Sequence, residues 1–448
     1  MNVALVQGLI NTVVIQGRRV KKKVLNSEFQ VGMYVCELDR PWLDTPFLFQ
    51  GFHIESLEQI EELRNHCDYV YIDPMISAEF SALPRLMTRP QPLMEDDKKL
   101  SSGPLQNFPL LSAEARKRGG VFQASTMSVY EDKSTVEEEL VIAKEVHRQC
   151  EDLMRNITRD IHTGHALDSK GIKAGVTDLV ESVVRNQDAM LLLTKLKRKD
   201  SYSFAHSIDV SIYMVAFGRC LGFPEAQLNI LGLGGLLLDV GKILLPDGLL
   251  EKKGALKPEE NAALKRHVLF GMQLVQNAES FPPEVLDIIE NHHERQNGSG
   301  YPRRLLAEEI GMFANMAAIV DCFQALTSVR PYATPVPPSE ALQRLFDWKD
   351  RFFHGALVEQ FIQCVGIYPV GSLVELNTGE VGIVISQNRV RRLQPKVLLI
   401  LDSFKKPYSY PLTLDLINKP KTVDDIPYEI KRTLEYGMYG VDPREYYL

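Results

Sequence analysis

An almost entirely apolar run, Leu228 to Leu238, constrains the fold more than any other part of the sequence, and it ends at Asp239. Three glycines within the run allow other helices to pack closely against it. A helix that is hydrophobic on every side is buried, so the run predicts a helix enclosed by other helices. The carboxylate at its end then needs a partner. Spacing alone leaves two partners open: Lys242, three residues further on, or a metal ion that leaves Lys242 available for an anion.

The remaining sequence predicts a multidomain protein that is mainly α-helical, with a small β-containing domain at each end of the helical part. Residues 1–87 contain short β-type runs around a helix-like segment and predict a small N-terminal α/β domain. Residues 88–133 are polar and rich in proline and predict a linker or mobile segment. Residues 134–365 show helical periodicity, with the helical core at 176–365. Residues 366–448, which alternate around an Asn-Thr-Gly turn, predict a C-terminal β extension and tail.

Composition excludes several classes of function. The chain of 448 residues has a formal net charge of -7, which gives no basic surplus for binding a nucleic acid polymer. Its six cysteines are scattered, so we expect reduced, buried thiols. The sequence shows no signal peptide and no uninterrupted apolar stretch of membrane-spanning length, which predicts a soluble, cytoplasmic protein.

Histidines and aspartates point into the predicted helical core. His206 shares a helix face with Val210, Tyr213 and Phe217, and His292 shares one with Ile288. A single inward histidine is usually a core residue with a hydrogen-bond partner. Several buried imidazoles together are costly without partners, however, and a shared metal ion would satisfy them.

Two further features accompany the histidines. Asp321 lies in an otherwise apolar helical segment. The pair His292-His293 runs into a turn containing Gly298 and Gly300 that ends at Pro302. The turn could simply connect two helices, but its place directly after two inward histidines favours the rim of a pocket.

These segments resemble, in order and spacing, the HD-GYP family of bacterial cyclic di-GMP phosphodiesterases. The resemblance covers about residues 176–365, and residues 20–150 resemble a small domain found before HD-GYP domains. The matching segments are DSYSFAHSIDV, LLLDVGKI, KRHVLFG, NHHERQNGSGYP and IVDCFQALTSVRPY.

The resemblance implies a bundle that holds one or at most two divalent transition metal ions, with iron, manganese, zinc or nickel all suited to mixed His/Asp ligands. The implied metal ligands are His206, Asp239, His267, His292, His293 and Asp321. Asp239 and Lys242 are the implied catalytic residues, and Lys242, Tyr301 and Arg330 the implied substrate-binding residues. In the family a metal-activated water attacks a phosphodiester of cyclic di-GMP and yields linear pGpG, which is in some cases hydrolysed to GMP.

The chain departs from the family pattern at several positions. Leu238 replaces the histidine of the HD pair, Gln324 stands where a second aspartate is usual, and Ala333 stands where a lysine or arginine is usual. Asn297 replaces an aspartate before GSGYP, a change that a turn tolerates. Tyr202 replaces the glutamate that gives some members a third metal ion.

Three functions therefore remain open from the sequence. The first is a cyclic di-GMP phosphodiesterase weakened by the loss of the histidine at Leu238. The second is an inactive receptor that binds cyclic di-GMP without turnover. The third is an interaction module that contacts other signalling proteins through its GYP face or its N-terminal domain.

Overall fold

The computed structural model describes residues 21–40, 52–54, 57–72, 74 and 128–441, the last range with gaps at 196–201, 247, 253, 255, 279, 329–334, 389–390, 392 and 436. The chain forms two compact units that divide near residue 115. Most of the predicted linker, including residues 88–127, lies outside the described residues.

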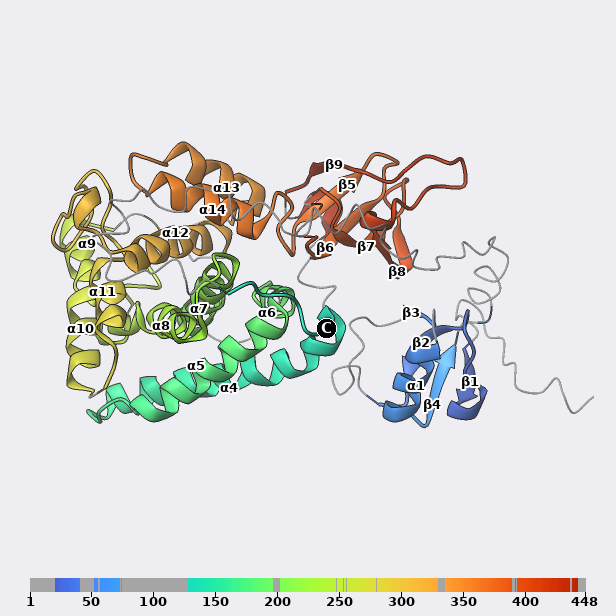
Figure 1. Ribbon diagram of the computed structural model, residues 1–448, viewed down its shortest axis with the longest axis horizontal. Coiled ribbons are helices and arrows are strands. Elements are labelled where there is room, and N and C mark those ends of the chain that lie inside the picture. The colour runs from blue at the N-terminus through green and yellow to red at the C-terminus, as the bar shows by residue number, and fades with distance from the viewer. Residues whose placement is uncertain are drawn as a thin grey trace, which may run out of the picture. The chain divides into compact units, whose positions relative to one another are not determined.

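The described part of the N-terminal unit is a small antiparallel sheet packed against helix α1, as the sequence predicts (Figure 1). Its strands lie in the order β1-β4-β2-β3. In β4, Val70 and Ile72 are buried while Tyr69 and Tyr71 are partly exposed, because alternate strand residues face opposite sides of a sheet. Ile60 and Leu63 of the helix complete the core. The elements are β1 (Lys22–Leu25), β2 (Tyr34–Leu38), β3 (Phe52–His53), α1 (Leu57–His66) and β4 (Tyr69–Ile72).

The second unit is a bundle of helices followed by a sheet, which confirms the mainly helical prediction (Figure 1). Its helices are α4 (Val136–His162), α5 (Ser169–Arg185), α6 (Gln187–Leu193), α7 (Tyr202–Cys220), α8 (Glu225–Leu237), α9 (Pro258–Lys265), α10 (His267–Asn277), α11 (Pro283–Asn291), α12 (Met312–Thr327), α13 (Pro338–Asp347) and α14 (Gly355–Val365). Short 3₁₀ helices, η7 (Val240–Leu244) and η8 (Ala307–Glu309), lie between them.

Helix α8 is the predicted apolar helix, and it packs against α5, α7 and α11. A side chain at Gly235 would place its Cβ 2.7 Å from the Cα atom of Ser211, so glycine there permits the close contact with α7. The segment Glu225–Leu244 is long and apolar enough to cross a membrane, with a mean hydropathy of 1.3. Because 67% of its most apolar window is buried inside the protein, it acts here as a core helix.

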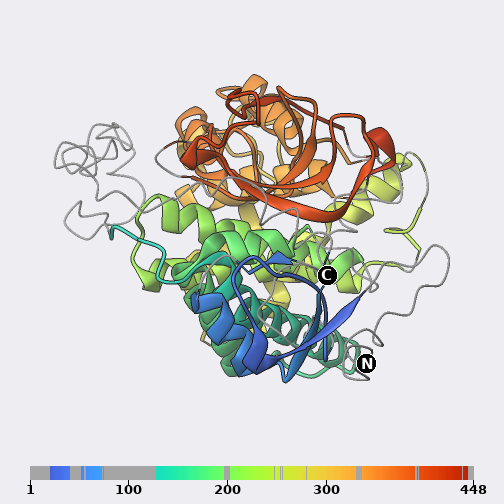
Figure 2. The same cartoon turned by 90° about the vertical axis from the view of Figure 1, so that its right-hand side faces the viewer.

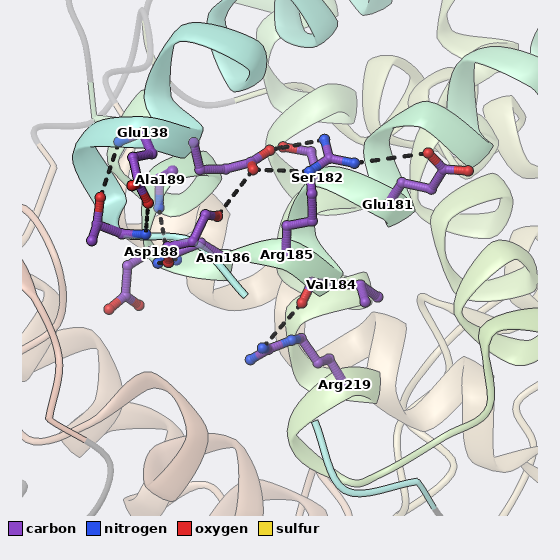
Figure 3. A network of polar contacts seen from close by, with 12 residues as sticks. Glu138, Glu181, Ser182, Val184, Arg185, Asn186, Asp188, Ala189 and Arg219 are labelled. Carbon is purple, nitrogen blue, oxygen red and sulfur yellow. Dashed lines mark hydrogen bonds and ion pairs between the residues drawn. The ribbon is translucent and has the colours of Figure 1, made fainter. Parts of the chain in front are cut away.

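The amphipathic helix α4 carries a buried carboxylate. Glu139 is 1% exposed and accepts hydrogen bonds from two guanidinium nitrogens of Arg185, both at 2.9 Å, and from Ser182 Oγ at 2.7 Å. Asn186 caps α6 nearby and donates to the Ser134 carbonyl (Figure 3). This polar network holds α4 against α5, because a buried charge is stable only when it is paired.

Residues 128–133, which the sequence prediction places in the linker, are bound to the helical bundle. The backbone N–H groups of Ser128 and Lys133 donate to the carbonyls of Gly222 and Arg185, both at 2.8 Å. Asp132 pairs with the buried Arg219 at 2.8 Å. These contacts join sequence-distant positions, which the polar composition of the segment could not indicate.

The C-terminal strands form a five-stranded antiparallel sheet in the order β8-β7-β6-β5-β9, drawn in orange and red in Figures 1 and 2. The predicted hairpin joins β5 and β6 through a turn in which Gly379 has a φ of +99°. Asp188 of α6 accepts hydrogen bonds from Ser386 Oγ and the Gln387 N–H, which ties the sheet to the bundle. The strands are β5 (Leu373–Leu376), β6 (Val381–Ser386), β7 (Lys396–Leu401), β8 (Pro407–Asp415) and β9 (Ile430–Thr433).

The prediction that all six cysteines are reduced thiols is wrong for two of them. Cys220 at the end of α7 and Cys364 in α14 form a disulfide across 144 residues of sequence. The two helices pack together there, and the rings of Phe217 and Phe361 lie 5.2 Å apart. Spacing along the chain cannot reveal a pairing that depends on how two distant helices pack.

The Glu139 network allows a direct test of its contribution to stability. We expect Glu139→Gln to lower the free energy of unfolding by about 2–3 kcal/mol, because it removes the charge that Arg185 and Ser182 contact. Glu145→Gln on the exposed face of the same helix is the matched control and should leave the urea midpoint nearly unchanged. Equal midpoints for the two variants would contradict this role of the network.

Candidate metal centre

The structure brings together all six side chains that the sequence singles out as metal ligands, and they come from five parts of the bundle. His206 lies on α7, Asp239 between α8 and η7, and Asp321 on α12. His267 is the first residue of α10, and the pair His292-His293 follows α11 directly. Their ligand atoms form two groups, and Asp239 belongs to both. Within each group the atoms lie within 4.8 Å of one another.

A close backbone contact positions Asp239 beside His267. The chain leaves α8 at Leu238, and Asp239 has φ and ψ of -105° and 7° before η7 begins. A Cβ atom at Gly241 would lie 2.0 Å from the His267 carbonyl oxygen and 2.4 Å from the Gly271 nitrogen. Only glycine therefore allows η7 to approach α10 closely enough to bring the carboxylate and this imidazole together.

The first group consists of Asp239, His267, His292 and His293. Nε2 of His267 lies 3.4 Å from Asp239 Oδ1, and Nε2 of His292 lies 3.8 Å from the same oxygen. The Nδ1 atoms of these two rings lie 2.7 and 2.9 Å from the backbone carbonyls of Leu264 and Ile289. A carbonyl can only accept, so Nδ1 carries the proton and Nε2 is left with its lone pair toward Asp239.

The protonation states of this group suit metal binding. Burial lowers the pKa of His267 to about 4 and also lowers the pKa of His292 and, strongly, of His293. The three imidazoles are therefore neutral at neutral pH, which is the form that coordinates a metal ion.

The second group consists of His206, Asp239 and Asp321. His206 Nε2 lies 3.0 Å from Asp321 Oδ1 and 3.5 Å from Asp239 Oδ2. Burial raises the pKa of Asp321, but the hydrogen bond and charge of His206 outweigh it and hold that pKa well below its usual range. Burial also raises the pKa of Asp239, but the ammonium of Lys242 and the neighbouring histidines lower it by more. The pKa of Asp239 is therefore below its ordinary value. Both carboxylates are therefore ionised.

The two oxygens of Asp239 have different surroundings. Oδ2 accepts a hydrogen bond of 2.6 Å from Lys242 Nζ, which is the pairing that sequence spacing allows. Oδ1 is buried and has no hydrogen-bond partner among the described residues, and neither have His206 Nδ1, His267 Nε2 and His292 Nε2. Buried polar atoms without partners are costly, and a divalent transition metal ion would satisfy the Asp239 oxygen and the two Nε2 atoms together. The residues of the first group therefore fit such an ion.

Two departures from the HD-GYP pattern have different structural consequences. Leu238 is completely buried and offers no ligand atom, so the second group has three side chains. Gln324 belongs to neither group; its Nε2 donates to Asp209 Oδ2 at 2.6 Å. Asp209 lies one helical turn after His206 on α7, and Gln324 lies one turn after Asp321 on α12. Two neighbouring polar contacts, His206–Asp321 and Asp209–Gln324, therefore connect the two helices. Sequence reasoning missed Asp209, although its spacing of three residues from His206 places it on the same helix face.

The turn after the two histidines forms the rim of the site. Glu294, 1% exposed, accepts hydrogen bonds from the backbone N–H groups of residues 303, 304 and 305. The Tyr301 ring stacks on His293 with centroids 4.6 Å apart and planes at 27°. Asn297 Oδ1 accepts from both the N–H and the hydroxyl of Ser299, a turn that an aspartate would form equally well. The sequence analysis missed Glu294, whose only local signal is its place directly after His293.

The predicted substrate-binding residues are only partly within the described structure. Lys242 and Tyr301 lie at the site, next to Asp239 and His293. Arg330 and Ala333 lie outside the described residues, and so does the side chain of Tyr202.

The helical fold with its buried His/Asp groups defines a protein of the HD domain class. Residues 187–355 match an HD domain model, residues 21–172 match a domain of unknown function (DUF3391), and residues 373–423 match a KOW domain associated with HD domain. The chain is 30% identical to "Cyclic di-GMP phosphodiesterase PA4108" of Pseudomonas aeruginosa over 389 residues, which covers 86% of each chain. The chain therefore belongs to the HD-GYP family.

Two further similarities are weaker or shorter. A "3'3'-cGAMP-specific phosphodiesterase 2" of Vibrio cholerae is 32% identical over 160 residues, which is 36% of this chain and 31% of that protein. The solved structure of Bd1817, a HDG"Y"P protein from Bdellovibrio bacteriovorus, covers 76% of this chain and 98% of its own with a TM-score of 0.40 and 16% identity. This structural likeness is too weak to transfer residues.

The contact between Gln324 and Asp209 explains why glutamine, rather than a second aspartate, stands at position 324. We expect Gln324→Asp to lower the free energy of unfolding by about 2–4 kcal/mol, because it places two carboxylates face to face in a buried site. Adding Asp209→Asn should restore most of the loss, since asparagine can donate to the new carboxylate. Urea unfolding of the single and double variants measures this coupling. Strictly additive changes would show that the two side chains do not interact.

Proposed function

We propose that this chain is a metal-dependent phosphodiesterase that opens cyclic di-GMP to linear pGpG. The observation that carries the proposal is the convergence of Asp239, His267, His292 and His293, in which Asp239 Oδ1 and the Nε2 atoms of His267 and His292 have no hydrogen-bond partner among the described residues. The similarity to PA4108 along 86% of both chains supports the same activity. Cyclic di-GMP is favoured over 3'3'-cGAMP because PA4108, which matches 86% of this chain, is named a cyclic di-GMP phosphodiesterase.

Each residue of the site has a role in this reaction. The first group would hold a divalent ion, which would supply a water nucleophile of lowered pKa and neutralise charge on the phosphoryl group. Asp239 would be one of the residues that hold the ion, and its Oδ2 positions Lys242, whose ammonium can donate to a phosphoryl oxygen of the substrate. Tyr301 keeps the His293 ring in place by stacking, and we assign Arg330, together with Lys242, to the charge on the reacting phosphate. Mixed His/Asp ligation suits iron, manganese, zinc or nickel.

The second group makes the activity weaker than that of a site with a complete set of ligands. It offers His206, Asp239 and Asp321 but no side chain from position 238, so it would hold a second ion loosely. Without a second ion, no metal charge would stabilise a second oxygen of the reacting phosphate. The same observation favours one other function, a receptor that binds cyclic di-GMP and releases it unchanged.

Metal content gives the first test. Protein purified without chelator should retain one tightly bound ion per chain after dialysis, held by the first group. His292→Ala should weaken its binding by more than the roughly 10–100-fold that loss of a supporting group costs. Elemental analysis measures the content, and His162→Ala at an exposed position is the control. Two ions per chain that survive dialysis would contradict the weakened second group.

Position 238 gives the second test. We expect slow release of pGpG from cyclic di-GMP by the wild-type protein, and an increase of about tenfold or more in Leu238→His, because an imidazole beside Asp239 adds a ligand for a second ion. Assays with added Mn²⁺ or Fe²⁺ should compare the wild type, Leu238→His and the apolar control Leu238→Met. Rapid turnover by the wild type would reject the weakened activity. Tight binding of cyclic di-GMP without any turnover would favour the receptor.

A further inference from the structure

The rim of the metal centre carries a cation to which no function has been assigned. Lys265 is the last residue of α9 and lies two positions before His267. Its ammonium lies 5.0 Å from the centroid of the Tyr301 ring, and that ring lies 4.6 Å from the His293 ring, so the ammonium is within about 10 Å of His293. A cation over an aromatic ring is attracted by the negative ring face, which holds the otherwise flexible side chain near the site.

Among the described residues no carboxylate pairs with the Lys265 ammonium, in contrast to those of Lys242 and Lys252. Lys242 pairs with Asp239 at 2.6 Å, and Lys252 pairs with Glu260 at 2.5 Å. Lys265 is exposed, and among the described residues its ammonium has no carboxylate within 4.0 Å. The next residue, Arg266, places its guanidinium 4.9 Å from the Phe270 ring instead of the Tyr301 ring. Among the described residues, Lys265 is therefore the cation that lies over the Tyr301 ring.

A cyclic dinucleotide needs a cation for its second phosphate as well, in addition to the cations assigned to the reacting phosphate. It contains two phosphodiesters, each with one negative charge, on opposite sides of its ring. When one of them reacts at the buried ligand groups beside Lys242, the other lies further out toward the rim. That second charge loses part of its hydration on binding, and this is favourable only if a protein cation replaces the water.

We propose that Lys265 binds the phosphate that does not react, and that Tyr301 positions Lys265 for this contact. The assignment rests on the proposed phosphodiesterase function. It makes Lys265 a substrate-binding residue that distinguishes cyclic dinucleotides, with two phosphates, from phosphodiesters with one. Because both phosphates are common to cyclic di-GMP and 3'3'-cGAMP, Lys265 contributes equally to the binding of either.

The test compares Lys265→Met with Lys257→Met in the full-length, metal-loaded protein. Lys257 lies at the opposite end of α9, eight residues away, or about 12 Å along a helix, so its replacement removes the same charge without touching the rim. The dissociation constant for cyclic di-GMP, measured by calorimetry, should rise about tenfold in Lys265→Met. The KM should rise with it at unchanged kcat, while Lys257→Met matches the wild type and Lys265→Arg retains most of the affinity.

A substrate with a single phosphodiester separates binding of the second phosphate from damage to the metal site. Hydrolysis of bis(p-nitrophenyl) phosphate and the metal content should be the same in Lys265→Met and the wild type. An unchanged affinity for cyclic di-GMP in Lys265→Met would overturn the assignment. It would also be overturned by an equal loss on both substrates, or by a loss for only one of the two cyclic dinucleotides. A wild-type protein that retains its metal but neither binds nor hydrolyses cyclic di-GMP would instead reject the proposed function itself.

Discussion

The burial of one carboxylate, that of Asp239, underlies the rest of the site. Asp239 follows a helix that is apolar on every side, so its carboxylate is buried and poorly hydrated. The negative charge must therefore be stabilised by protein groups or by a bound ion. Lys242 compensates one oxygen, and the other faces the Nε2 atoms of two histidines. Asp239 alone belongs to both ligand groups, so the packing of α8, η7 and α10 decides the geometry of both at once.

The departures from the family pattern are not equivalent, although they look alike in the sequence. Leu238 removes a ligand at the metal centre. Gln324 removes none, because its amide is used one turn further along α7 and α12 in a contact with Asp209. Of these two departures, only the one at position 238 leaves a ligand group with one side chain fewer. Glutamine at 324 is a compensated change that keeps α7 and α12 connected next to the His206–Asp321 contact.

The turn that forms the rim of the site is in contact with the ligand groups as well. Glu294 holds the turn from residue 303 to 305, and the same turn presents Tyr301 to His293. The ammonium of Lys265 lies over the Tyr301 ring, so two rings connect this exposed lysine to His293 in the first ligand group. The exposed rim and the buried His/Asp groups are thus joined by one continuous set of contacts.

Features that repeat along the chain were predictable from the sequence alone. The apolar run of α8, the amphipathic face of α4 and the β5–β6 hairpin follow from periodicity and turn residues, and the structure has all three. The six clustered side chains were implied by the resemblance to the HD-GYP family, and the inward helix phases of His206 and His292 agreed with it. Only the tertiary structure decided four other features. They are the contacts of residues 128–133 with the helical bundle, the Cys220–Cys364 disulfide, the Asp209–Gln324 contact and the position of Lys265 over Tyr301. Each of these joins residues far apart in sequence, and their distance depends on how whole helices pack, which local periodicity does not specify.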